Sequence, residues 1–417
     1  NHKSSLRSPT SVSPIQLPED TKSPIKSVME SARTTFGIGI LGCARIAKKN
    51  CRAAKSAACQ ITAVASRSSE KARDFVEEVL SGQDAAPAIF AGGDAYTQLL
   101  SSELNSVYIP LPTKLHEQYV AKALSSEKHV LLEKPVATSS TSYQQMLEAA
   151  SQSGKFLMDG TMFVHHPRTK SFAKTIPNPN RVTFNFTFDG DDDFFRNDIR
   201  IKKDGDFMGC VGDLGWYCVR MGLLVFSSLD AGRLKGQIKA AQVVRYQLND
   251  EGVPFDADCI VHFSGNRVLS FHCSFIHPLN QTVTVSGTGS EYTASMTDAI
   301  LPRQGDMLSY TLVRQGLISY DEITTEDSKE VQIDNSHVQE VCMWKNFAKW
   351  ARKIEEESGS AAADTKNGTW WSGGSDEVKE ANGIALYSIY TQIVLDALMK
   401  SIKLDGEKVK VNGFEES

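Results

Sequence analysis

Two short motifs hold residue types that can move a proton. Glu133, Lys134 and Pro135 follow a short apolar run, while Asp213 and Tyr217 lie one helical turn apart in a later segment. A free tyrosine has a pKa of about 10, too high for an efficient base at neutral pH, but a nearby ammonium lowers that pKa. If the fold brings Lys134 to Tyr217, the pair could take the proton from a substrate hydroxyl while its carbon gives up a hydride.

Each motif also has a plainer interpretation. Glu133 and Lys134 could form a surface ion pair at a strand end, and Tyr217 could be a core aromatic with a satisfied hydroxyl. His165 and His166 are interpreted as structural rather than catalytic, because no metal-ligand spacing surrounds them. We therefore expect no metal site.

The elements that must position the first motif alternate in type. Short apolar runs separated by amphipathic stretches predict βαβ units and a parallel sheet. The expected strands are 36–41, 61–66, 106–110, 129–132 and 156–159, and the expected helices are 45–57, 70–80, 114–125 and 140–153. Ligands bind outside the carboxyl ends of the strands in such sheets, which places Glu133 and Lys134 at the expected site.

A glycine-rich turn opens the first expected helix. When the dinucleotide fingerprint GxGxxG is aligned on Gly42, its second and third glycines are replaced by Ala44 and Ala47. Ala44 adds one methyl group where a pyrophosphate would approach the helix amides. A turn that is merely tightly packed is the alternative. The residues expected to contact a dinucleotide here are Gly42, Ala44, Arg45 and Ile46.

The residues at the end of the second expected strand indicate whether the cofactor is NAD or NADP. NAD enzymes usually place Asp or Glu there for the ribose 2′-hydroxyl, whereas this chain has Ser66 and Arg67, with Lys71 one turn later. A guanidinium would pair with a 2′-phosphate, so we expect NADP in preference to NAD, the alternative being a solvated surface arginine. His116 could contact the cofactor or serve packing alone. The next strand ends complete the expected cofactor site with Pro110, Leu111, Pro112, Thr113, His116, Glu133 and Lys134.

After about residue 180 the apolar period changes to two. Every second residue is apolar in 181–188 and 269–275, which predicts an antiparallel sheet with one buried and one exposed face. A helix is expected near 212–226, and two helices near the end of the chain flank an expected surface loop at 355–376.

The expected fold therefore has two parts. An α/β Rossmann domain with a doubly wound parallel sheet precedes an α+β domain of open, predominantly antiparallel β-sheet flanked by helices. The expected divisions are a tail at 1–35, the cofactor domain at 36–160, a substrate and dimerisation domain at 161–402, and a tail at 403–417. The final helices could pack back on the Rossmann domain.

Composition argues against several classes of partner. The formal charge of −5 does not favour nucleic acid, and no uninterrupted apolar run approaches the roughly 20 residues of a membrane span. The eight cysteines form no CxxC pair, which is typical of reduced, buried thiols. Residues 1–35 are rich in Ser, Thr, Pro and Lys, so they are expected to be a disordered tail or a targeting remnant. The expected location is the cytoplasm or a plastid, without secretion.

Together the motifs resemble the Gfo/Idh/MocA oxidoreductase family. The similarity rests on the EKP sequence at 133–135, on the segments 158–162 and 165–168, and on the run from Gly212 to Cys218. It covers nearly all of the chain beyond the tail, residues 36–402. The chain is most similar to plant-type members and to the branch with glucose–fructose oxidoreductase, dimeric dihydrodiol dehydrogenase and NADP-dependent xylose dehydrogenase.

The resemblance implies roles that spacing could not show. It places Lys134 beside the nicotinamide and the reacting hydroxyl, and it makes Asp213 and Tyr217 catalytic, with Tyr217 where many members have His. It implies hydride exchange with a sugar, polyol or trans-dihydrodiol, and a homodimer formed through the C-terminal sheet. The implied substrate-binding residues are Thr161, Arg200, Asp213 and Tyr217. A non-catalytic NADP-binding regulatory or structural member is the alternative, against which the retention of Lys134 and Tyr217 argues.

Overall fold

The computed structural model describes residues 36–82, 85–319, 322–357 and 368–411. The expected tail at 1–35 and the end of the expected C-terminal tail, 412–417, lie outside the described residues. Residues 36 onward form one compact unit.

The first part of this unit is a six-stranded parallel sheet in the order β3-β2-β1-β4-β5-β6, which is the doubly wound Rossmann order. Its strands are β1 Phe36–Leu41, β2 Cys59–Ser66, β3 Ala88–Ala91, β4 Ser106–Ile109, β5 His129–Leu132 and β6 Leu157–Asp159. Its helices are α2 Arg45–Ser56, α3 Ser69–Leu80, α4 Ala95–Leu100, α5 His116–Ser125 and α6 Ser140–Gln152. The predicted strands and helices are present, but the sequence analysis missed β3 and α4. β3 has four largely exposed residues and therefore no buried apolar run to detect.

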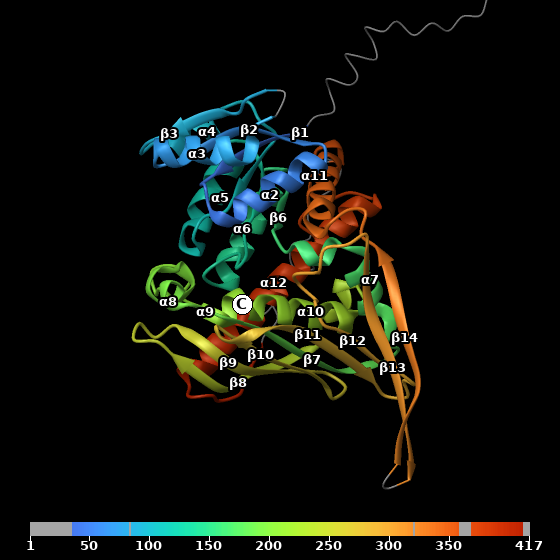
Figure 1. Cartoon of the computed structure of the whole chain (residues 1–417). Helices are drawn as coiled ribbons and strands as arrows, with labels where there is room; N and C mark the ends of the chain where they lie inside the picture. Colours follow the sequence, from blue (N-terminus) through green and yellow to red (C-terminus); the bar gives the residue numbers. More distant parts are fainter. Residues whose placement is uncertain (1–35, 83–84, 320–321, 358–367, 412–417) are drawn as a thin grey trace, which may run out of the picture. The chain divides into compact units, whose positions relative to one another are not determined.

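The second part is a nine-stranded sheet in the order β14-β13-β12-β11-β7-β10-β9-β8-β15 (Figure 1). All its neighbouring strands pair antiparallel except β7 and β10, which are parallel. The strands are β7 Pro179–Asp189, β8 Ile238–Leu248, β9 Pro254–Phe263, β10 Arg267–Ser274, β11 Ile276–Gly287, β12 Thr293–Met296, β13 Met307–Ser319, β14 Glu322–Asp334 and β15 Val409–Lys410. The predicted fold class is confirmed.

Helices cover one face of this second sheet. They include α7 Pro167–Thr175, α9 Gly209–Asp213, α10 Gly215–Ser227 and α12 Asp376–Lys403. The alternation in β7 follows from this arrangement, because Val182 and Phe184 are fully buried beneath the helices whereas Thr183 and Asn185 are half-buried on the opposite face. Among the described residues, the stretch Gly209–Ser227 is long and apolar enough to cross a membrane, but it is 94% buried within the protein, as a core helix is.

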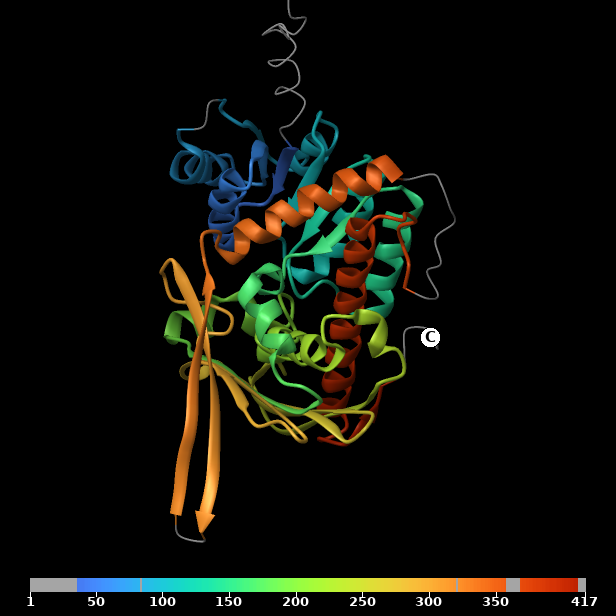
Figure 2. The ribbon, with the colours of Figure 1, turned by 90° about the vertical axis from the view of Figure 1, so that its right-hand side faces the viewer.

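Two long helices join the two sheets. α11 Gln339–Glu357 packs against α2, and α12 runs from α6 and β6 down to β8 (Figure 2). At this junction the Arg220 guanidinium lies 3.3 Å from Asp159 Oδ2 and donates from Nε to Thr391 Oγ1 at 2.8 Å. Ser388 also donates to Asp159. This cluster of Asp159, Arg220, Ser388 and Thr391, the junction network, ties the end of the Rossmann sheet to α10 and α12.

The prediction of a surface loop between α11 and α12 is wrong for the part of this segment that the structure describes. Trp370 and Trp371 are only 1% and 3% exposed. The Trp370 amide donates to Asn382 Oδ1, and Trp371 Nε1 donates to the carbonyl of Lys155. The two rings fill the space between α12 and the Rossmann domain and are therefore part of the core. Residues 358–367 of this loop lie outside the described residues.

Candidate active site

The two proton-moving motifs meet where the Rossmann sheet faces α9 and α10. Lys134 follows β5, Asp213 ends α9 and Tyr217 lies in the first turn of α10. Lys134 Nζ forms an ion pair with Asp213 Oδ1 and lies 3.3 Å from the Asp213 carbonyl oxygen. The same nitrogen is 5.0 Å from the centre of the Tyr217 ring, within cation–π range. The fold therefore brings together residues that are 79 and more positions apart.

Asp213 is shared between two cations. Its second oxygen, Oδ2, lies 3.1 Å from Nε of Arg200, which also pairs with Asp198. Burial disfavours a charged carboxylate here, but Lys134 and Arg200 outweigh burial and lower the Asp213 pKa. Burial also disfavours the Lys134 ammonium, yet the Asp213 carboxylate raises the Lys134 pKa above its ordinary value. The pair is charged at neutral pH, and Asp198 is a site residue that the sequence analysis did not single out.

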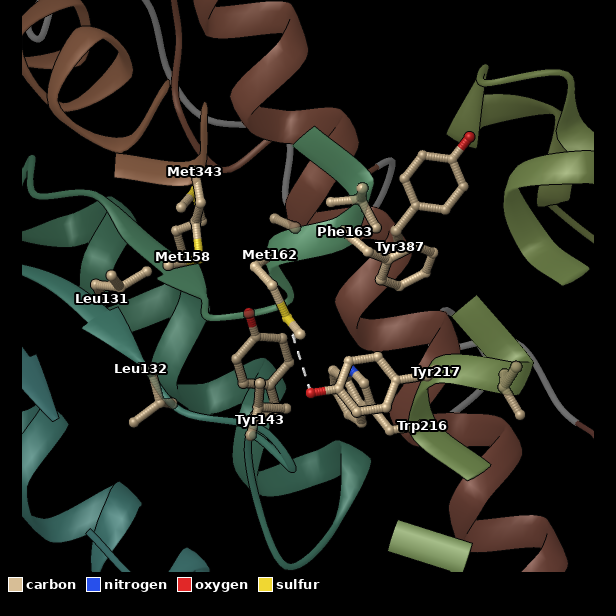
Figure 3. Close-up of a cluster of buried hydrophobic side chains, with 14 of the residues drawn as sticks. Leu131, Leu132, Tyr143, Met158, Met162, Phe163, Trp216, Tyr217, Met343 and Tyr387 are labelled. Carbon is tan, nitrogen blue, oxygen red and sulfur yellow. Dashed lines mark hydrogen bonds between the residues drawn. The ribbon is translucent and has the colours of Figure 1, made fainter. Parts of the chain in front are cut away.

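Tyr217 lies in an apolar pocket and is 8% exposed. Its ring packs 5.6 Å from that of Phe186 and 5.9 Å from that of Phe163. The hydroxyl points to the sulfur of Met162, 3.9 Å away (Figure 3). A thioether is a weak acceptor, so this hydroxyl can form a much stronger hydrogen bond with an incoming oxygen.

Burial raises the pKa of Tyr217 to about 12, even though Lys134 acts in the opposite direction. The expected lowering of this pKa is therefore wrong for the net effect. Carboxylates at Glu133 and Asp213 add to burial, and the ion pair with Asp213 offsets much of the Lys134 charge. In this state the hydroxyl stays protonated at neutral pH, so Tyr217 has a proton that it could donate.

Glu133 lies behind the site rather than at its surface. Its carboxylate accepts hydrogen bonds from Tyr108, from Asn50 at 3.3 Å and from the backbone amide of Lys134 at 3.2 Å. Asn50 also donates to the Tyr108 hydroxyl at 2.7 Å. This network fixes the turn that carries Lys134, and the expected contact of Glu133 with a cofactor stays a prediction. Asn50 and Tyr108 were not identified from the sequence, because a lone polar residue in a helix or strand carries no motif.

The glycine-rich turn has the geometry of a phosphate cradle. Gly42 has a φ of +106°, and a Cβ there would lie 2.9 Å from the Leu111 side chain, so only glycine fits without strain. Ala44 precedes α2 without a side-chain cap, and the first helical turn has no acidic residue. The amides at Arg45 and Ile46 therefore lie at a helix start that favours an anion. Both side chains are exposed beside them.

The carboxyl end of β2 is basic. Ser66 is buried and accepts a hydrogen bond from the Ser68 amide, while Arg67 and Lys71 are exposed. No carboxylate takes the position that binds a ribose 2′-hydroxyl in NAD enzymes, since Ser66 is followed directly by Arg67. Together with the uncapped start of α2, these residues fit a dinucleotide that carries an additional phosphate.

The segment after β4 contacts both domains. Pro110 is buried and Leu111 and Pro112 are half-buried, so the latter two line the turn. Thr113 donates from its amide and its hydroxyl to Oδ1 of Asp206, at 3.3 and 2.5 Å. Asp206 belongs to the second domain and was not identified from the sequence.

His116 is 1% exposed, which favours the packing alternative, and its contact with a cofactor stays a prediction. Its ring nitrogens lie 2.8 Å from the Leu111 carbonyl oxygen and 3.1 Å from the Val136 carbonyl oxygen. These contacts hold together the two loops that follow β4 and β5. Thr161 is similarly internal, because it is fully buried and its hydroxyl accepts a hydrogen bond from Trp216 Nε1 at 2.7 Å. Its side chain fixes α10 rather than facing a substrate.

The chain resembles known proteins in both sequence and fold. Residues 36–161 match the model of an oxidoreductase family with an NAD-binding Rossmann fold, Gfo/Idh/MocA. A dTDP-3,4-didehydro-2,6-dideoxy-alpha-D-glucose 3-reductase from Streptomyces violaceoruber is 34% identical over 50% of this chain and 59% of its own length. D-xylose 1-dehydrogenase (NADP(+)) 2 from Haloferax volcanii is 27% identical over 65% of this chain and 79% of its own length. The match to the first of these relatives thus spans less than two thirds of that protein.

Solved structures share the fold across both domains. A 3-ketoreductase from Actinomadura kijaniata, in complex with NADP and TDP-benzene, superposes with a TM-score of 0.65 at 20% identity. It covers 88% of this chain and 98% of its own. An aldose–aldose oxidoreductase from Caulobacter crescentus gives a TM-score of 0.66 at 14% identity, over 90% of this chain and 99% of its own. By sequence, residues 36–161 match the Rossmann domain of the Gfo/Idh/MocA oxidoreductase family, and the solved structures share the fold of both domains.

Proposed function

We propose that this protein is an NADP-dependent oxidoreductase that transfers a hydride between the nicotinamide and a CH–OH group of a sugar, polyol or dihydrodiol, or the matching ketone. The meeting of Lys134, Asp213 and Tyr217 carries the proposal. A buried, protonated phenol with only a weak acceptor lies beside a fixed ammonium, at the carboxyl edge of a Rossmann sheet. That arrangement suits protonation of a carbonyl oxygen.

The chain's own residues supply the proton and the electrostatics. Tyr217 holds a proton at its hydroxyl and donates it to the substrate oxygen in the reductive direction, and the phenolate recovers it in the oxidative direction. Lys134 stabilises negative charge on that oxygen or on the phenolate, because Asp213 keeps its ammonium in place. The bound cofactor supplies or accepts the hydride at the nicotinamide. Arg200, 38% exposed, is positioned by Asp213 to donate to a substrate hydroxyl or anionic group.

Cofactor binding is assigned to the cradle and to the end of β2. Gly42 and the amides that begin α2 would hold the pyrophosphate. Arg67, with Ser66 and Lys71, would hold the 2′-phosphate, which favours NADP over NAD. Relatives named for NADP, such as the xylose dehydrogenase from Haloferax volcanii, support this preference.

The open face of the second sheet is the proposed homodimer surface. Thr183, Asn185, Ile260 and Val268 on this face are half-buried, and the helices lie on the other side of the sheet (Figure 1). Sedimentation of the purified protein would test this assembly, and a monomer at micromolar concentration would refute it.

Titration of the protein with NADPH and NADH tests the cofactor assignment. We expect Arg67→Ala to weaken NADPH binding about tenfold, because one charge-assisted contact is lost, and to leave NADH binding unchanged. Arg73 is an exposed arginine on α3, the helix that follows Arg67, so Arg73→Ala is the matched control and should alter neither affinity. Equal losses for both nucleotides in Arg67→Ala would contradict the assignment.

Turnover on the same samples tests the chemistry. A panel of sugars, polyols, dihydrodiols and their ketones should contain a substrate that wild-type protein converts and that Lys134→Met and Tyr217→Phe do not. Tight NADPH binding without turnover on any of them would favour a regulatory role for the fold. Failure to bind either nucleotide would show that the methyl group of Ala44 blocks the cradle.

A further inference from the structure

Three residues that can bind a metal converge on the face of the second sheet opposite the helices. Asp256 lies on β9, His272 on β10 and His277 on β11. Their candidate ligand atoms all lie within 4.8 Å of one another. On the same strands Ala257 and Cys273 are buried against the helices, so this cluster is separated by the sheet from the proposed active site.

One carboxylate oxygen faces both imidazoles. Asp256 Oδ1 lies 2.8 Å from His272 Nε2 and 3.8 Å from His277 Nδ1. Two donors on a tetrahedral metal ion, with bonds of about 2.0–2.1 Å, are about 3.3 Å apart. These two separations lie on either side of that value. His277 Nδ1 also lies 2.8 Å from Ser274 Oγ, so the His277 ring must turn away from this hydroxyl to bind an ion. The two rings are nearly perpendicular, at 81°, with centroids 4.9 Å apart.

A second layer of contacts fixes the carboxylate in this orientation. Arg245 and Gln247 donate to Oδ2 of Asp256, at 2.6 and 3.1 Å, which leaves Oδ1 turned toward the histidines. Arg245 also pairs with Asp258, so two carboxylates face one guanidinium and the immediate charge remains negative. Partners of this kind orient the ligands of protein metal sites.

In the single chain, the cluster is open to an entering ion. Asp256 is fully buried, but the side chains of His272 and His277 are 20% and 46% exposed. Both histidines line a surface hollow of about 780 Å³, whose other polar walls include Asn185, Thr187, Asn280, Asp298 and Arg303. Three protein ligands would leave at least one coordination position facing this hollow, where water or another small ligand could complete the shell.

We propose that Asp256, His272 and His277 form a binding site for a divalent transition metal ion, with zinc as the preferred ion. Two imidazoles and one carboxylate are a ligand set that suits zinc and its neighbours, whereas calcium and magnesium require oxygen ligands. His272 and His277 lie on either side of the turn from β10 to β11. The ion therefore fastens that turn to β9 and stabilises this corner of the sheet. The site does not depend on the proposed hydride transfer.

This site escaped the sequence analysis, which expected no metal. Its ligands lie on three strands, and the histidines flank a turn rather than sharing a helical face. Asp256 pairs with Ser274 across β9 and β10, so it approaches His272 diagonally, from two positions along the strand. The sequence does not show this register.

Zinc binding to the chelator-treated, full-length protein tests the proposal. Calorimetric titration at pH 7.5 should give one site with a Kd below about 10 μM. Zinc at a hundredfold excess over that Kd should raise the melting temperature by about 3–6 °C. His277→Gln should weaken binding at least tenfold, and because this side chain is half exposed, the variant should fold normally. Cobalt titration should give visible absorption bands in wild-type protein that are lost in the variant.

His262→Gln is the matched control. His262 lies on the same face of β9 but belongs to no group of potential metal ligands, so this variant should bind zinc as wild-type protein does. NADPH affinity should be the same in all three proteins, which verifies their folding. Absence of zinc binding in wild-type protein, or equal affinities in wild-type and His277→Gln, would overturn the proposal.

Discussion

Two charged networks lie between the Rossmann sheet and α10, and they differ in what surrounds them. In the junction network, Arg220 and Asp159 are 0% and 1% exposed, and every contact is made within the protein. In the candidate active site, Lys134 and Asp213 are each 11% exposed, and Arg200 is 38% exposed. The hydroxyl of Tyr217 beside them is held only by a sulfur.

This difference separates structural charge from reactive charge. A buried ion pair with all its hydrogen bonds satisfied has no capacity left for a ligand, and its removal leaves an uncompensated charge. The active-site network retains donors on Lys134, Arg200 and Tyr217 that can turn toward a substrate. The same pairing of acid and base therefore fixes the domains at one place and leaves chemistry possible at the other.

The largest expected effect is on turnover. Lys134→Met should reduce kcat by about 10³-fold or more, because it removes the charge that stabilises the substrate oxygen and the phenolate. The melting temperature should change by only a few degrees, since Arg200 still pairs with the Asp213 carboxylate. Single-turnover kinetics and a thermal melt on one sample measure both. If Lys134→Met instead unfolded the protein while each folded molecule kept its turnover, the Lys134 network would be structural rather than reactive.

Arg220→Met should show the opposite profile. It leaves Asp159 buried without its cation, which should lower the free energy of unfolding by about 3–5 kcal/mol. Denaturant unfolding measures the loss. Because Arg220 does not contact Lys134 or Tyr217 in the described hydrogen bonds, kcat below the melting temperature should stay within a few-fold of wild type. A double change, Arg220→Met with Asp159→Leu, should recover part of the stability.

The sequence predicted the two motifs better than it predicted their energetics. The alternation of strands and helices and the EKP turn follow from local patterns that the fold retains. The hairpin β13–β14 was missed because its apolar alternation is short: Leu308 and Tyr310 are buried, but most residues of β14 are polar. The effect of Lys134 on Tyr217 was mispredicted, since a sequence does not show that Asp213 offsets the lysine charge or that Phe163 and Phe186 enclose the phenol.

The smallest expected effect is a displaced titration. Tyr217 should ionise with a pKa of about 12, above the ordinary tyrosine value of about 10, because burial favours the protonated form. Its hydroxyl therefore keeps its proton as the pH rises through 10 and loses that proton near pH 12. Tyrosinate absorbance of wild-type protein minus that of Tyr217→Phe isolates this group.

Two variants of the active-site network should shift that titration in opposite directions. Asp213→Asn removes a carboxylate that opposes ionisation and leaves the Lys134 charge less neutralised, so the pKa of Tyr217 should fall. Lys134→Met removes the cation that favours the phenolate, so the pKa should rise beyond that of wild-type protein. Arg220→Met should shift it little. A fall in Lys134→Met would mean that the ammonium does not act on the phenol, and the proposed proton donor would lose its electrostatic partner.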